Sequence, residues 1–233
     1  VVYYFYGALK LCTPEKPVSF SVPTGNFGNV FAGYGAKRMG LNIEKLIIGS
    51  NSNDIFSRFF EDGRMQTAAV QPTISPSMDI QISSNFERLL FELSGRDGKI
   101  TQTMMKTFSK TGSFEVGKSQ LEKALYLFAA QRFTDNETLA IMTQVLKENK
   151  EILDPHSAIG VAAGRAKRIN KNTPHISLAT AHPAKFPDTI ENSIGLEVLH
   201  PSLENFKSKP IIKYTVEPNP EAIKRFMREH LSD

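Results

Sequence analysis

The pattern of apolar and polar residues predicts a strand, a glycine loop and a helix in immediate succession near the start of the chain. In residues 18–22 the β-branched and aromatic side chains alternate with serine, which is typical of a strand. A loop that contains Gly25 and Gly28 follows, and apolar residues then recur at helical spacing as far as Gly40, a suitable helix C-cap. The amide groups at the start of this helix therefore lie directly beyond the end of a strand.

The next segments repeat this alternation of strand and helix. Residues 45–49 predict a buried strand, and the Asn, Ser and Asp residues at 51–54 predict the N-cap of a short helix through Phe60. Residues 71–77, with two prolines, predict a loop. Residues 84–93 predict a helix, because their large apolar residues share one face: Phe86, Leu89, Leu90 and Leu93. Such alternation is typical of a parallel sheet.

The second half of the chain is less regular. Glycines divide residues 94–131, for which we expect short helices over a flank of the sheet. Residues 134–137 form a capping box that starts a helix, and Asp154 followed by Pro155 starts another. This last helix carries a stripe of small and branched residues suited to lying close against a sheet: Ile159, Ala162, Ala163, Ala166 and Ile169.

Three more elements complete the predicted fold. Residues 175–180 predict a strand, residues 211–216 an edge strand, and residues 221–231 a surface helix. We find no internal repeat and no linker long enough to separate independent domains. The predicted fold class is therefore α/β, with a mostly parallel sheet flanked by helices, and residues 1–233 are expected to form a single unit.

Composition and charge exclude several classes of protein. The net charge of +4 comes from 28 basic and 24 acidic residues without a polybasic run, so nucleic acid is not an expected partner. No apolar run approaches the roughly 20 residues that a membrane span needs. The single cysteine, Cys12, excludes an internal disulfide and fits a reducing compartment, which favours the cytoplasm.

The glycine loop is a candidate anion site. Amides at a helix start point outward, and the helix dipole favours negative charge there. Gly25 and Gly28 lack a Cβ, which lets the main chain take positive φ and approach phosphate oxygens closely. By spacing alone, however, such a turn is more often structural than functional. It matches neither the dinucleotide fingerprint nor a Walker A loop, since the third glycine and the closing Gly-Lys-Ser/Thr are missing.

The residues of the loop are more specific than their spacing. Residues 23–29, Pro-Thr-Gly-Asn-Phe-Gly-Asn, resemble the cofactor-phosphate loop of threonine synthases, pyridoxal-phosphate enzymes of the tryptophan-synthase-β-like fold type II. Four further blocks are similar to that family and follow in the family's order: residues 75–80, 83–91, 154–156 and 180–186. In the family the aromatic opening segment lies within a helix in the middle of the protein, so the chain resembles the C-terminal part of a longer enzyme.

The resemblance implies a site for pyridoxal 5'-phosphate. Its phosphate would be bound by the loop residues Gly25, Asn26, Phe27, Gly28 and Asn29. Thr180 would hydrogen-bond the pyridine nitrogen of the cofactor, and a neutral hydroxyl there would leave that nitrogen largely unprotonated. The implied activity, a step of threonine biosynthesis, converts the small-molecule substrate O-phosphohomoserine and water to threonine and phosphate.

This chemistry also requires a lysine that binds the cofactor aldehyde. The resemblance places it in a Phe-Lys-Asp motif upstream of the residues seen here, so no catalytic residue is assigned to this chain. Lys110, in Phe-Ser-Lys, and Lys185 match neither the motif nor its place, and we interpret both as surface residues. The chain alone is therefore expected to be inactive.

Other polar residues are weaker candidates. Ser84, Asn85 and Arg88 form a set of donors near a helix start that would suit a substrate phosphate, although a solvated helix face is an equally good interpretation. His156 and His182 have no partner at metal-ligand spacing, so we interpret them as capping or packing residues and predict no metal site.

Two alternative functions stay open. A threonine-synthase-like phospholyase would share every block above but would release a keto acid from phosphorylated hydroxyamino acids. A non-catalytic anion-binding or regulatory module would keep the glycine loop and lack the upstream lysine. The sequence also leaves the oligomeric state open.

Overall fold

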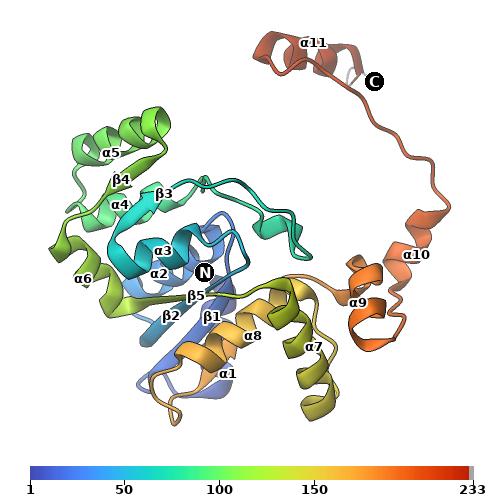
Figure 1. Ribbon diagram of the computed structural model, residues 1–233, viewed down its shortest axis with the longest axis horizontal. Helices are drawn as coiled ribbons and strands as arrows, with labels where there is room; N and C mark the ends of the chain where they lie inside the picture. Colours follow the sequence, from blue (N-terminus) through green and yellow to red (C-terminus); the bar gives the residue numbers. More distant parts are fainter. Residues whose placement is uncertain (231–233) are drawn as a thin grey trace. The chain divides into compact units, whose positions relative to one another are not determined.

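The structure, a computed structural model, describes residues 1–230 and divides into two compact units, Val1–Val198 and Leu199–Asp233 (Figure 1). Within the described residues, no helix is both long enough and apolar enough to cross a membrane. The expectation that the chain acts as a single unit stays a prediction.

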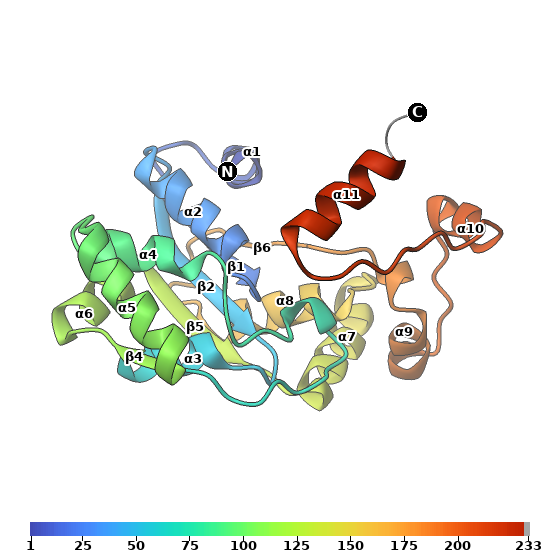
Figure 2. The same ribbon diagram turned by 90° about the horizontal axis from the view of Figure 1, so that it is seen from above.

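The first unit is built on a parallel sheet of four strands in the order β5-β2-β1-β6, whose labels are all visible in Figure 2. The strands are β1 (Val18–Pro23), β2 (Ile43–Ser50), β5 (Phe128–Arg132) and β6 (His175–Ser177). Every pair of neighbours is parallel, with Ile47 of β2 opposite both Ser21 of β1 and Ala129 of β5. The carboxyl ends of the strands therefore share one edge, and the predicted α/β class is confirmed.

Helices cover both faces of the sheet (Figure 2). On one face lie α1 (Val2–Leu11), α2 (Gly28–Arg38), α3 (Ile55–Asp62), α4 (Phe86–Leu93), α5 (Gly98–Thr111) and α6 (Lys118–Leu127). The other face carries α7 (Asp135–Asn149) and α8 (Pro155–Lys167), with α9 (Pro187–Ile194) against α7. Short elements complete the unit: η1 (Pro76–Met78), η2 (Pro183–Lys185) and the antiparallel pair β3 (Arg64–Gln66) and β4 (Ser113–Glu115).

Small residues bring α8 close to the sheet. A Cβ at Gly49 of β2 would lie 2.9 Å from Ile159, and a Cβ at Gly160 would lie 3.0 Å from Pro23. The predicted stripe is correct at its start and wrong at its end, because Ala166 is exposed and Ile169, 69% exposed, follows the end of the helix. The glycines of the helix, rather than its last apolar residues, extend the contact.

Two further sequence predictions need correction. Asp54 precedes α3 but its side chain makes no capping bond; it pairs instead with Arg58 at 2.8 Å. Residues 94–131 contain, besides two helices, the short strand β4 and most of the strand β5, and the sequence analysis missed both. Pairing with β3 forms β4. The strand β5 is the one that belongs to the main sheet. Its residues, Phe-Ala-Ala-Gln-Arg, include no β-branched side chain, and pairing with β2 rather than local propensity makes them a strand.

The second unit contains α10 (Pro201–Lys207) and α11 (Pro220–His230). The predicted surface helix is confirmed up to His230, and Leu231 lies outside the described residues. The predicted edge strand at 211–216 is wrong: in the described part of the chain these residues form no ladder and belong to neither sheet. Tyr214 instead packs on Phe226 of α11, with ring centroids 5.0 Å apart.

A buried histidine makes the stability of the first unit depend on pH. Burial, assisted by the charge of Arg168, lowers the pKa of His175 to about 4, and its Nε2 lies 3.0 Å from Ser21 Oγ. The unfolded chain, in which histidine has its ordinary pKa near 6.5, binds the proton more readily. The unfolding free energy is therefore complete above about pH 6.5 and falls between pH 6.5 and 4.

We expect this loss to be about 1–2 kcal/mol, after allowance for solvent screening of a side chain that is not fully buried. Urea titrations of the wild type and of His175→Gln at pH 7.0, 5.5 and 4.5 would measure it. The variant should lose less stability on acidification than the wild type. Parallel losses in the two proteins would show that His175 is not the group responsible.

Candidate anion site at the carboxyl edge of the sheet

The glycine loop follows directly after β1, which with β2 forms the centre of the sheet. Thr24 N–H donates to Gly49 O at 2.9 Å, so the chain stays paired with β2 up to the first residue after β1. Contrary to the sequence expectation, neither Gly25 nor Gly28 has a positive φ; the left-handed residue is Phe27, with φ 67° at the start of α2. The turn into the helix is therefore made by a residue with a large side chain.

Packing holds Phe27 in this unfavourable conformation. A left-handed non-glycine residue costs roughly 1–2 kcal/mol. The Phe27 ring is 1% exposed and packs against Phe56 and Phe86, each with a centroid distance of 5.0 Å. Burial of a whole aromatic ring outweighs this cost, so the hydrophobic core fixes the shape of the loop.

Gly25 serves a different purpose, the close approach of a second segment. A Cβ at this position would lie 2.7 Å from Ser77 O and 3.0 Å from Met78 Cα. Both atoms belong to main chain at η1, which cannot move aside as the end of a flexible side chain can. The loop thus needs glycine here because another backbone lies against it.

A buried polar network holds that second segment. The Asp79 Oδ1 atom accepts hydrogen bonds from Asn51 Nδ2 at 2.8 Å, Asn53 Nδ2 at 3.0 Å and Thr73 Oγ1 at 2.7 Å. Asn51 and Asn53, which the sequence suggested as helix caps, follow directly after β2 and are almost fully buried. The segment from Thr73 to Asp79 is therefore fixed to the carboxyl end of β2.

The loop presents free backbone donors. In the described part of the chain, no hydrogen bond engages the amides of Gly25, Asn26, Phe27, Asn29 and Val30, while Gly28 N–H donates to Asn26 Oδ1 at 3.0 Å. Several unpaired amides at the start of a helix form a cradle for an anion, and the helix dipole adds to the attraction. The residues present therefore fit a phosphate group.

The start of α4 lies beside this cradle. Asn26 O accepts hydrogen bonds from Ser83 Oγ at 2.7 Å and from Asn85 Nδ2 at 3.1 Å, and Asn85 Nδ2 also donates to Ser84 Oγ at 3.2 Å. Arg88, one turn further along α4, is exposed. The structure thus brings Ser83 and Asn85 into contact with the glycine loop, whereas Ser84, in the part of the chain that the structure describes, is hydrogen-bonded only to Asn85. The sequence analysis did not single out Ser83, because no local pattern shows a contact with a residue 57 positions away.

Thr180 lies at the same edge of the sheet. Ser177 of β6 is opposite Ser21 of β1, and Leu178 N–H donates to Ser21 O at 2.9 Å. Continued for three residues, this register places Thr180 level with Thr24, where the glycine loop begins. The two predicted parts of the site therefore follow the carboxyl ends of neighbouring strands, β6 and β1.

The N-terminus of α8 supports Thr180. Thr180 N–H donates to Ser157 Oγ at 3.1 Å, and the Ser157 hydroxyl in turn donates to Asp154 Oδ2. Asp154 caps the helix as predicted, accepting from the backbone N–H of His156 at 2.9 Å. Burial opposes ionisation of Asp154, but the hydrogen bonds from His156 and Ser157 outweigh it and hold its pKa below the usual range.

The two histidines near this edge have structural contacts. His156 is 4% exposed, its Nδ1 lies 3.0 Å from Asp154 Oδ1, and its ring packs on Phe186. The His182 side chain caps η2, with Nδ1 accepting from Ala184 N–H at 3.2 Å. Both contacts agree with the capping and packing interpretation.

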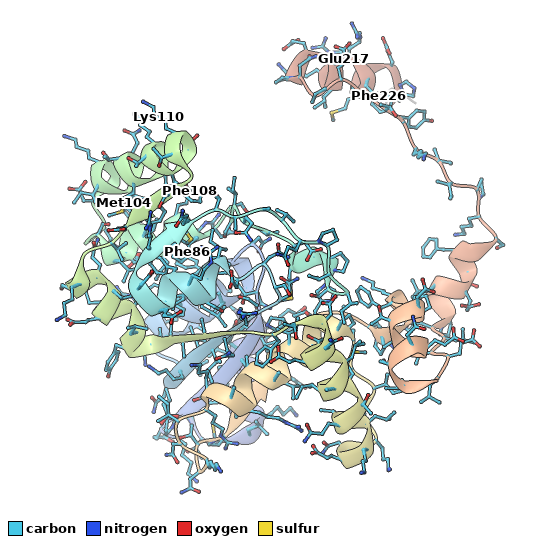
Figure 3. The ribbon with its side chains drawn as sticks, viewed as in Figure 1. Phe86, Met104, Phe108, Lys110, Glu217 and Phe226 are labelled. Carbon is cyan, nitrogen blue, oxygen red and sulfur yellow. The ribbon has the colours of Figure 1, made fainter. Side chains whose placement is uncertain are left out.

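Lys110 and Lys185 are both distant from the glycine loop in the sequence, and within residues 1–230 no hydrogen bond or ion pair joins either side chain to the loop. Lys110 is exposed in the last turn of α5, on the outside of the molecule, whereas Phe108 is buried against Phe114 (Figure 3). Lys185 is exposed in η2. The interpretation of both as surface residues agrees with these positions.

Fold and site together define a parallel α/β unit with an anion cradle at its carboxyl edge. The family described as "Threonine synthase, C-terminal" matches residues 157–227. The chain is 45% identical to a threonine synthase of Pseudomonas aeruginosa over 193 residues, 83% of this chain and 41% of that protein. It is 38% identical to the threonine synthase of Saccharomyces cerevisiae over 260 aligned residues, covering 100% of this chain and 51% of that protein.

Solved structures give the same result. The crystal structure of a pyridoxal-phosphate-bound threonine synthase from Brucella melitensis superposes with a TM-score of 0.91 at 46% identity, covering all of this chain and 50% of that one. The yeast enzyme superposes with a TM-score of 0.87 at 37% identity, covering 99% of this chain and 51% of that one. The chain belongs to the threonine synthase family and spans about half the length of the relatives it matches.

Proposed function

We propose that this chain supplies the cofactor-phosphate cradle of a threonine synthase. The observation that carries the proposal is the set of unpaired amides of Gly25, Asn26, Phe27, Asn29 and Val30. The buried ring of Phe27 fixes the conformation of the loop that carries them. Gly25, Asn26, Phe27, Gly28 and Asn29 bind the phosphate of pyridoxal 5'-phosphate. The Brucella melitensis relative, bound to that cofactor and alike over the whole chain, supports this assignment.

Each remaining polar group has a proposed task in the reaction of O-phosphohomoserine with water to give threonine and phosphate. When bound, pyridoxal phosphate supplies the electron sink for this chemistry. The uncharged Thr180 hydroxyl forms a hydrogen bond with the pyridine nitrogen. The bond from Thr180 N–H to Ser157 Oγ positions this residue. Ser84, Asn85 and Arg88 bind the substrate phosphate, and the guanidinium supplies the charge. The amine that binds the cofactor aldehyde comes from the half of the family's length that this chain does not span, so the chain alone is inactive.

A cofactor analogue without the aldehyde tests the cradle independently of any lysine. Pyridoxine 5'-phosphate should bind at least tenfold more tightly than pyridoxine, because only the former has a phosphate to place on the free amides. Thr180→Ala should weaken both ligands by a similar factor of about 5–10, the value of one hydrogen bond. Calorimetric titration measures all four affinities, and equal affinity for the two ligands would contradict the proposal.

The reaction itself is tested on an enzyme that carries these residues together with the family's lysine. Threonine and phosphate should form from O-phosphohomoserine. A relative named threonine synthase-like 1, in Homo sapiens, is 34% identical over 79% of the chain, so the phospholyase alternative needs a direct comparison. Formation of a keto acid from a phosphorylated hydroxyamino acid, without threonine, would favour that alternative.

A further inference from the structure

A groove runs along the outer edge of β5, the last strand of the sheet. Its cavity volume is about 530 Å³, and all five residues of the strand line it: Phe128, Ala129, Ala130, Gln131 and Arg132. Successive side chains of a strand point to opposite faces of the sheet. A cavity that touches five in a row therefore lies along the edge of the strand, where its backbone is accessible. Residues of α3 and Lys167, the last residue of α8, line the groove as well.

The hydrogen-bond pattern shows which backbone groups face this groove. Phe133 N–H donates to Ser50 O at 2.9 Å, so Phe133 turns toward β2. In a parallel ladder the main-chain N–H and C=O groups of alternate residues point to the same neighbouring strand. The main-chain groups of Ala129 and Gln131 therefore also point to β2. Ala130 and Arg132 therefore direct their main-chain groups into the groove. Within the described residues, no partner is found for the N–H and C=O of Ala130 or for the N–H of Arg132.

Positive charge is in excess along the groove. Asp54 is shared by two guanidinium groups, with Arg58 Nε at 2.8 Å and Arg132 Nε at 3.6 Å. Two more cations, Lys45 and Lys167, line the cavity, against one further acid, Glu61. Lys45 is committed to the carbonyls of Leu125 and Tyr126, but Lys167 is exposed. The walls therefore carry four basic side chains against two acidic ones.

We propose that the edge of β5 binds an extended peptide segment with acidic side chains, which adds to the sheet as a fifth strand. Strand addition would satisfy the unpaired groups of Ala130 and Arg132, and acidic side chains would meet Arg132 and Lys167. The five residues of β5 match a partner segment of about 17 Å, at about 3.3 Å per residue. A second copy of the chain fits less well, because pairing two β5 edges would bring like charges together.

A pair of synthetic peptides tests the proposal on the intact chain. The probes are blocked hexapeptides in which valine alternates with glutamate or with lysine. The glutamate peptide should bind at least tenfold more tightly than the lysine peptide and should slow hydrogen exchange at the Ala130 amide. Equal binding of the two peptides, or unchanged exchange at Ala130 in the complex, would overturn the proposal.

Two double variants test the contribution of charge to peptide binding. Arg132→Glu combined with Lys167→Glu should reverse the preference between the peptides. Lys99→Glu combined with Lys110→Glu, exposed positions on α5, makes the same change of charge away from the groove and should leave it intact. A reversal in both double variants would show a general charge effect and refute a specific site.

Ala130→Pro removes the outward N–H, and proline is tolerated in an edge strand where that group faces outward. Binding of the glutamate peptide should fall at least tenfold while the circular dichroism spectrum is retained. Retained binding in a folded variant would refute strand addition. If the variant does not fold, exchange at Ala130 in the wild-type complex decides the same point.

Discussion

Gly25→Ala should reduce the affinity for pyridoxine 5'-phosphate at least tenfold and should also lower stability. The added methyl group would lie 2.7 Å from Ser77 O, closer than real Cβ atoms approach. Because Asp79 and its partners fix the segment behind it, the glycine loop must move instead, and its amides lose their common orientation. Overpacking of this kind costs typically 1–3 kcal/mol. Calorimetric titration of the ligand and urea unfolding measure the two effects.

Gly35→Ala provides the matched control. Gly35 lies within α2, ten residues from Gly25, and a Cβ there has Val1 Cγ2, at 3.8 Å, as its nearest neighbour. Alanine in a helix interior is favoured over glycine by roughly 0.5–1 kcal/mol, so this variant should keep its ligand affinity and gain a little stability. A Gly25→Ala protein with unchanged affinity would show that the phosphate binds elsewhere.

Asp154→Ala should lower the unfolding free energy by about 3–7 kcal/mol. The substitution removes a helix N-cap, worth roughly 1 kcal/mol, and leaves the buried donors His156 Nδ1 and Ser157 Oγ without their acceptor, at about 1–3 kcal/mol each. Because the pKa of Asp154 is held below its usual range, its contribution is present above about pH 4 and is lost as the pH falls further. Urea unfolding at pH 7 and at pH 3 measures both effects.

Asp154→Asn separates the charge from the hydrogen bonds. The amide oxygen still caps the helix, so the loss at pH 7 should be about half that of Asp154→Ala. Hydrogen exchange at the Thr180 amide should accelerate in the alanine variant, because Ser157 is no longer fixed as its acceptor. A loss below 1 kcal/mol for Asp154→Ala, with unchanged exchange at Thr180, would contradict this role.

Local sequence patterns determined much of this protein. The alternating run before Pro23, the capping box at Thr134 and the Asp154–Pro155 helix start were all interpreted correctly, because each depends on residues close together in the chain. The apolar face of α4 is also as predicted, with Phe86, Leu89, Leu90 and Leu93 all buried. The resemblance of the glycine loop and of the later blocks indicated the family from the sequence alone.

Tertiary structure alone decided how the site is built. The left-handed conformation belongs to Phe27 and not to a glycine, since three other phenylalanines enclose its ring. Gly25 is required by Ser77 O, and Thr180 is held by Ser157, 23 residues away. Likewise β5 became a strand by pairing with β2, while residues 211–216 pair with no strand among the described residues. Local patterns determine what a segment can form, whereas contacts between distant residues select its conformation, because burial and hydrogen bonding across the fold outweigh local propensity.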